Sequence, residues 1–112
     1  MNTNQAVNNQ PHTIKTLRQA SYKTRCIHER LVINEYGKIE LVPLFEIKDC
    51  GMQNRILNYG GNTIIEITTP DGKHDVVGES KCSKKDAYQK KYGVNVALGR
   101  AVSELVKLGY LV

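Results

Sequence analysis

Apolar positions in the middle of the chain form short runs that are separated by turn residues. Isoleucine, leucine and valine dominate residues 25–34 and 38–47, and residues of this kind favour strands. Between the two runs, residues 35–37 read Glu-Tyr-Gly and supply a glycine for a turn. We therefore predict a first hairpin. Pro43 has no amide hydrogen, so it makes the second strand an edge strand or marks a bulge.

A second hairpin is predicted over residues 63–81. Residues 63–69 are rich in β-branched side chains, residues 74–81 include Val76 and Val77, and residues 70–73 between them read Pro-Asp-Gly-Lys. Proline and glycine supply the backbone angles that a tight turn needs, so this is the clearest turn signal in the chain.

The apolar period becomes helical in the C-terminal third. Ser83 is a good helix cap, and Asp86 three residues later completes a pair like a capping box. Tyr92-Gly93 predicts a stop or a kink, and Gly109 predicts the end of the helix. One stripe, with spacings of three and four residues, is expected to face the core: Val94, Leu98, Ala101, Leu105 and Leu108.

These elements predict an α+β domain over residues 13–112. Its antiparallel sheet of two hairpins carries a long C-terminal helix, beginning at about Ser83, on one face. Ile14 and Leu17 indicate a short helix before the first strand. Residues 1–12 are rich in asparagine and glutamine, which bury too little apolar area to offset the entropy of ordering. We expect them to form a disordered N-terminal arm.

Positive charge gathers at the two ends of the chain. The net charge is +5: residues 1–25 carry +4, residues 26–80 carry −4 and residues 81–112 carry +5. A basic cluster of this kind attracts nucleic acid or another polyanion, and the alternative is a merely solvated surface. No stretch approaches the roughly 20 apolar residues of a membrane-spanning helix, and the first residues are polar. We expect a cytoplasmic protein with no membrane partner.

The three cysteines, Cys26, Cys50 and Cys82, are widely spaced and odd in number, which predicts free thiols in a reducing compartment. Cys26 and His28 share one face of a predicted strand. Two ligands do not complete a tetrahedral zinc site, so we expect no metal and small, buried, apolar cysteines.

No nucleophile, base or phosphate-loop pattern is present, so we expect no cofactor and no enzyme. Local sequence patterns do not reveal a site whose residues are far apart in the chain and meet only in the fold.

A basic motif follows the second hairpin directly. Residues 83–87 read Ser-Lys-Lys-Asp-Ala, and lysines in the first turn of a helix oppose the helix dipole by about 0.3–1 kcal/mol each. Free backbone amides and cations at one helix start together form an anion site. The alternative is that the lysines reach into water. The candidate nucleic-acid-binding residues are Lys81, Lys84, Lys85 and Lys91.

A strand followed by Ser-Lys-Lys-x-Ala and an amphipathic helix resembles the C-terminal half of double-stranded RNA-binding domains. That family has an α-β-β-β-α plan, and its Lys-Lys pair opens the last helix and contacts phosphates. The resemblance covers about residues 74–105. Glu79 and Lys81 stand where the family has glycines, Tyr88 replaces its third lysine, and Gly93 interrupts the helix.

The string Lys81-Cys82-Ser83, with Asp86 and Tyr88, also looks like a C-terminal signature of small bacteriophage and mobile-element accessory proteins. This resemblance implies a non-enzymatic accessory protein in a phage-infected or lysogenic bacterial cell. The phage-type resemblance leaves open that the fold is kept while the RNA function is lost. The leading hypothesis is that the protein binds the phosphate backbone of nucleic acid, double-stranded by analogy with the double-stranded RNA-binding family, whether RNA or DNA.

Two alternatives from other functional classes stay open. One is a protein-binding inhibitor of a host factor or host defence complex, of the anti-CRISPR type. The other is an oligomerising subunit, which would expose an apolar strand edge and form a stable dimer. Salt dependence separates nucleic-acid binding from the protein-binding inhibitor, because contacts with phosphate weaken steeply as salt rises whereas a mostly apolar protein interface does not.

Overall fold

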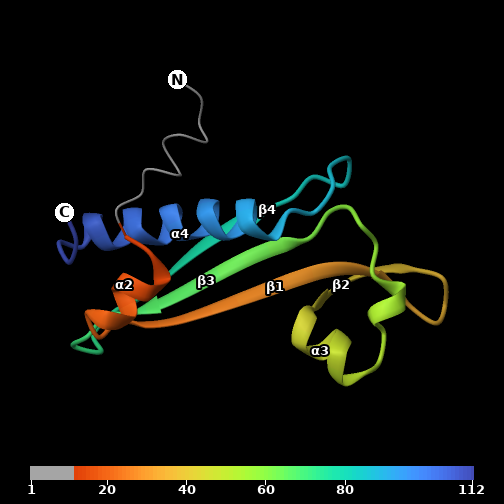
Figure 1. Ribbon diagram of the computed structural model, residues 1–112, viewed down its shortest axis with the longest axis horizontal. Helices are drawn as coiled ribbons and strands as arrows, with labels where there is room; N and C mark the ends of the chain where they lie inside the picture. The colour runs from red at the N-terminus through yellow and green to blue at the C-terminus, as the bar shows by residue number, and fades with distance from the viewer. Residues whose placement is uncertain (1–11) are drawn as a thin grey trace.

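Four antiparallel strands in the order β2-β1-β3-β4 form the sheet of the computed structural model (Figure 1). The structure describes residues 12–112, so all but the last residue of the predicted N-terminal arm lies outside the described residues. Both predicted hairpins are confirmed, and the pairing of β1 with β3 joins them into one sheet. The strands are β1 (Lys23–Ile33), β2 (Ile39–Pro43), β3 (Asn62–Thr68) and β4 (Asp75–Lys81).

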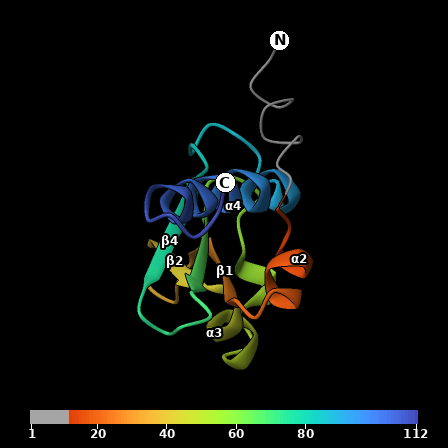
Figure 2. The same ribbon diagram turned by 90° about the vertical axis from the view of Figure 1, so that its left-hand side faces the viewer.

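Helices flank this sheet, and the predicted α+β class is confirmed. The short helix expected before the first strand is α2 (Ile14–Gln19), and the long C-terminal helix is α4 (Lys90–Lys107). Figure 2 shows α4 and α3 (Leu44–Asp49) on opposite sides of the molecule. A 3₁₀ turn, η1 (Gln53–Arg55), follows α3. No helix within residues 12–112 is long and apolar enough to cross a membrane.

The second strand is shorter than predicted. It was expected over residues 38–47, but β2 ends at Pro43 and α3 follows directly. Proline cannot donate a hydrogen bond to a ladder, so the strand ends where the proline stands. Ile47 of α3 is then fully buried in a small cluster with Val32 and Val42. The edge position predicted for the Pro43 strand is confirmed.

Helix α4 packs very closely on the sheet at Gly78 of β4. A Cβ atom on Gly78 would overlap the carbonyl oxygen of Ala97 and lie 2.5 Å from the backbone nitrogen of Ala101. Both alanines are fully buried. Small residues on both sides therefore let the helix backbone approach the strand directly. Of the predicted stripe, Leu98, Ala101 and Leu105 are buried in the core there with Ile65 and Ile67 of β3, and Val94 packs against them. Leu108 exposes 45% of its surface, so the prediction that it faces the core is wrong.

The beginning of α4 differs from the prediction. The helix begins at Lys90 and not at about Ser83. Residues 82–88 run beside residues 58–61, and backbone groups that would have formed the first helical turns bond to that segment instead. The hydrogen bonds are Cys82 N to Gly61 O at 2.8 Å, Gly60 N to Asp86 O at 3.1 Å and Tyr88 N to Asn58 O at 3.0 Å.

The end of α4 agrees with the prediction. Gly109 has a φ of +86° immediately after the C-cap residue Leu108. Its amide bonds to Val106 O at 3.0 Å, and the amide of Tyr110 bonds to Leu105 O at 3.0 Å. This pair of bonds is a Schellman motif, for which glycine is favoured because it accepts a positive φ. The chain then turns back, so that Tyr110 packs on the core.

Candidate functional site

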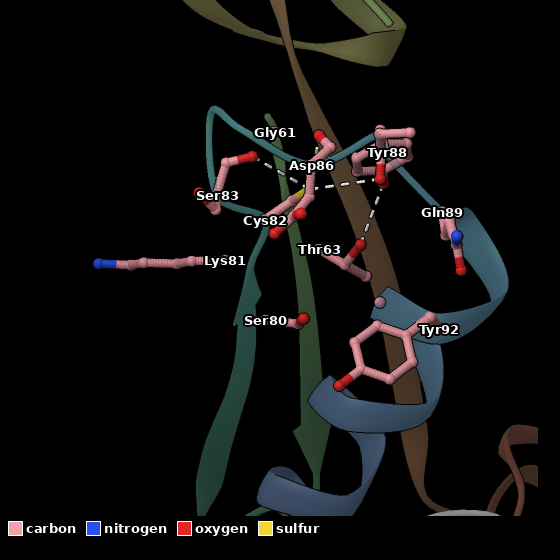
Figure 3. Close-up of a pocket in the computed structure, with 12 residues that line it drawn as sticks. Gly61, Thr63, Ser80, Lys81, Cys82, Ser83, Asp86, Tyr88, Gln89 and Tyr92 are labelled. Carbon is pink, nitrogen blue, oxygen red and sulfur yellow. Dashed lines mark hydrogen bonds between the residues drawn. The ribbon is translucent and has the colours of Figure 1, made fainter. Parts of the chain in front are cut away.

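A cavity of about 670 Å³ lies between the end of β4, the connection of residues 82–89 and the first turn of α4. Figure 3 shows Thr63 on its floor and Tyr92 at its side. The connection over the cavity is held by its hydrogen bonds to residues 58–61. Polar residues that line it include Ser80, Asp86, Tyr88 and Gln89.

The four predicted lysines surround this end of the molecule, and all are exposed. Lys81 ends β4 and points away from the cavity (Figure 3); its ammonium group lies 3.8 Å from the carboxylate of Glu79. Lys84 and Lys85 lie in a turn, where the amide of Lys85 donates to Ser83 Oγ at 3.2 Å. Ser83 thus caps a turn and not a helix.

The lysines at the helix start are Lys90 and Lys91. The prediction that Lys84 and Lys85 open the helix is wrong, because hydrogen bonds to residues 58–61 delay the helix. Lys90, which was not among the predicted residues, takes the first helical position that was predicted for Lys84. The N-cap residue Gln89 makes no capping hydrogen bond with its side chain, and the first turn contains no acid. Helix dipole and lysine charge therefore both make this end positive.

Two residues that line the cavity, Thr63 and Tyr88, belong to a polar cluster that the sequence did not reveal. His28 Nδ1 is 2.5 Å from the hydroxyl oxygen of Tyr88, and Thr63 Oγ1 is 3.0 Å from the same oxygen. The guanidinium carbon of Arg30 lies 4.2 Å from the centre of the Tyr88 ring, a cation–π contact. Residues from β1, β3 and the connection meet here. The pairing of β1 with β3 places His28 directly opposite Thr63. Tyr88 reaches them from the connection, far away in the sequence.

Burial and nearby cations keep the histidine of this cluster neutral. Burial lowers the pKa of His28 below its ordinary value of 6.5, and the charges of Lys90 and Arg30 lower it further. Burial also raises the pKa of the Tyr88 hydroxyl. Both groups are therefore uncharged at neutral pH.

The thiols are more accessible than predicted. Cys26 and Cys50 are exposed and Cys82 is half-buried, so the expectation of buried cysteines is wrong. Cys26 Sγ lies 3.5 Å from Nε2 of His28, because the two side chains share one face of β1. No group of three or more His, Cys, Asp or Glu side chains within residues 12–112 is arranged to hold a metal ion.

Comparison with known proteins identifies no relative: no family model, no curated protein and no solved structure matches the chain. The likeness to double-stranded RNA-binding domains therefore stays a prediction. The observed element order contains one strand more than that family's plan, and α3 lies between the two hairpins.

Proposed function

We propose that the protein binds nucleic acid by its phosphate backbone through residues 81–91, which we call the basic segment. The observation that supports this most directly is its charge. The segment carries Lys81, Lys84, Lys85, Lys90 and Lys91, all exposed, against a single acid, Asp86. Clustered exposed cations raise the local concentration of a polyanion and release its counterions on binding.

The backbone of the basic segment supports this function as well. Lys84 and Lys85 lie on a turn, and Lys90 and Lys91 lie on the first turn of α4, so the lysines border one end of the molecule. The helix start adds backbone amides that a phosphate oxygen can accept from. The hydrogen bonds between the connection and residues 58–61 hold these groups in place. The resemblance noted above favours a duplex and an accessory role in a phage-infected cell.

The test is a gel-shift series with duplex RNA, duplex DNA and single strands at two salt concentrations. The double variant Lys84→Ala/Lys85→Ala is expected to keep its fold, because both side chains are exposed. It should bind all sequences more weakly and reduce the salt slope by about two units, at roughly 0.9 per lost phosphate contact.

A matched control removes two charges elsewhere. Lys38 and Lys48 are also exposed but lie in the β1–β2 turn and in α3. The double variant Lys38→Ala/Lys48→Ala loses the same net charge and is expected to keep nearly the full salt slope. Equal losses in the two double variants would show a general charge effect. Unchanged binding in the Lys84/Lys85 variant would refute the proposal.

A second candidate function, self-association, is favoured by the exposed edge strand β2. Ile39 and Leu41 expose 53% and 42% of their surface, and an apolar edge can pair with another strand. Antiparallel pairing of two copies about Ile39 would place Lys38 opposite the Glu40 of the second copy, which adds charge complementarity.

Sedimentation should show a dimer that Ile39→Lys dissociates and that Val77→Lys, on another exposed position, does not. A monomer throughout would rule out self-association through this edge.

A further inference from the structure

The three cysteines have different surroundings, and only Cys26 contacts a histidine within the described residues. Its Sγ atom lies 3.5 Å from Nε2 of His28, and the residue as a whole is exposed although the thiol itself is partly shielded from water. Cys50 is exposed at the end of α3. Cys82 is half-buried, and its Sγ atom lies 3.5–3.6 Å from three carbonyl oxygens of the connection. Cys50 and Cys82 therefore serve as internal controls when the reactivity of Cys26 is measured.

The imidazole of His28 is held in a fixed orientation. Its Nδ1 atom contacts the hydroxyl of Tyr88 at 2.5 Å and that of Thr63 at 3.3 Å. The His28 and Tyr88 rings meet edge to face, with an interplanar angle of 87°. Because these contacts occupy Nδ1, the other nitrogen is directed at the Cys26 thiol. A nucleophile, a base and a group that orients the base form the arrangement that activates thiols in proteins.

We propose that Cys26 is a thiol-modification site at which His28 acts as the base, and that it reacts with small anionic disulfides to form a mixed disulfide. Lys90 supplies the preference for an anion, since its charge acts on both Cys26 and His28. Arg30, two residues beyond His28 on the same face of β1, adds a second cation to this surface.

The reaction balances without a further reagent. His28 Nε2 takes the proton from the Cys26 thiol, and the sulfur attacks one sulfur atom of the disulfide. The disulfide bond breaks as the new S–S bond forms, and the second sulfur leaves as a thiolate. That thiolate accepts the proton from Nε2, which restores neutral His28. Cys26 is oxidised and the leaving sulfur is reduced.

The electrostatics make the role of His28 measurable. Burial raises the pKa of Cys26, and the charge of Lys90 offsets this in part. Without the base, Cys26 therefore has less thiolate than an ordinary thiol and should react slowly. The lowered pKa of His28 leaves its imidazole neutral at pH 7.5, so Nε2 has a lone pair for the thiol proton, and the same shift makes it a weaker base than an ordinary histidine. A Cys26 that reacts faster than Cys50 thus requires the base.

The experiment treats the full chain with glutathione disulfide at pH 7.5 and measures the mixed disulfide at each cysteine by peptide mass spectrometry. Cys26 is expected to react at least about tenfold faster than Cys50, a modest effect for a positioned base. His28→Gln should reduce the rate at Cys26 to that of Cys50 or lower. Tyr88→Phe, which removes only the orienting hydroxyl, should give an intermediate rate.

The charge preference has its own matched pair of variants. Lys90→Gln should slow the reaction of Cys26 with glutathione disulfide but not with cystamine, a cationic disulfide. Lys91→Gln loses the same charge on the next residue and should change neither rate. In every variant, unchanged rates at Cys50 and Cys82 show that the fold is intact. A Cys26 slower than Cys50 in the unmodified protein, or a rate unaffected by His28→Gln in a folded variant, overturns the proposal.

Discussion

Gly93 of α4 lies against Thr63 of β3 so closely that the glycine has no room for a side chain. A Cβ atom on Gly93 would overlap Oγ1 of Thr63 and lie 3.2 Å from its Cβ. Thr63 in turn contacts His28 and Tyr88. The first turn of α4 is thus held directly on the polar cluster, which explains a glycine inside a helix, where it costs about 1 kcal/mol.

The variant Gly93→Ala is therefore expected to destabilise the protein. Helix propensity alone predicts a gain of about 1 kcal/mol, whereas forcing a methyl group into a filled contact costs about 1–3 kcal/mol. We expect the steric cost to exceed the gain, measured as a lower midpoint of urea unfolding. Ser103→Ala, an exposed position in the same helix, should be neutral or slightly stabilising.

Thr63→Ala provides the coupling test for this contact. It removes the hydroxyl that the methyl group of Gly93→Ala would meet. The double variant Thr63→Ala/Gly93→Ala should therefore lose less free energy of unfolding than the sum of the losses in the two single variants. Additive losses would show that the two residues do not interact in this way.

Local signals in the sequence account for both hairpins and for the end of α4. The turn at residues 70–73 and Gly109 act through their own backbone angles, so their effect can be read without knowing the rest of the fold. Pro43 marked an edge strand for the same reason. It also ended that strand early, and the apolar residues after it, Leu44 and Ile47, fitted a helix as well as a strand.

The start of α4 could not be predicted, because a long-range interaction decides it. Ser83 and Asp86 form a good capping pair, but residues 82–88 instead bond to residues 58–61. Nothing in the local pattern reports those bonds. The cluster of His28, Thr63 and Tyr88 was missed for a related reason: its members are up to 60 residues apart in sequence. Four of the five exposed lysines of the basic segment were found, because charge clusters are visible in the sequence; Lys90 was not.

Leu105→Ala should destabilise the protein by about 2–5 kcal/mol, as truncation of a buried leucine does. Leu105 is fully buried in the main core, whereas the neighbouring Val106 exposes 43% of its surface. Val106→Ala removes a side chain from the same helix and should change the unfolding free energy by no more than about 0.5 kcal/mol. Chemical denaturation of both variants tests the predicted direction of the apolar stripe. Equal effects would show that α4 does not bury this face.

Stability should fall as the pH drops below 6.5, because His28 resists protonation in the folded protein. Between its lowered folded pKa and 6.5, the unfolded chain binds a proton that the folded protein does not, so acid favours unfolding. This loss of stability is absent above pH 6.5 and reaches its full size below the pKa that His28 has in the folded protein. Urea midpoints at a series of pH values should show a slope in this window that His28→Gln reduces.

The turn of the second hairpin and the C-terminus meet at Asp71, whose pKa is lowered from 3.8 to about 2. The main causes are hydrogen bonds: Thr69 Oγ1 and the hydroxyl of Tyr110 each donate to the carboxylate at 2.6 Å, and the amide of Lys73 donates at 3.0 Å. A lowered carboxyl pKa means that the ionised form stabilises the fold. This contribution is present above pH 3.8 and is lost as the pH falls through about 2.

Titration of the Asp71 carboxyl carbon by NMR should therefore give a midpoint near 2. Tyr110→Phe removes one of the two side-chain donors while the Thr69 bond remains, so the midpoint should rise part of the way to 3.8. Because hydrogen bonds outweigh the charge of Lys73 among the causes, about 0.5 M salt should move the midpoint little. Tyr36→Phe, at a residue that exposes 79% of its surface, is the matched control and should leave the midpoint unchanged. A midpoint near 3.8 in the unmodified protein would show that the C-terminus does not dock on this turn in solution.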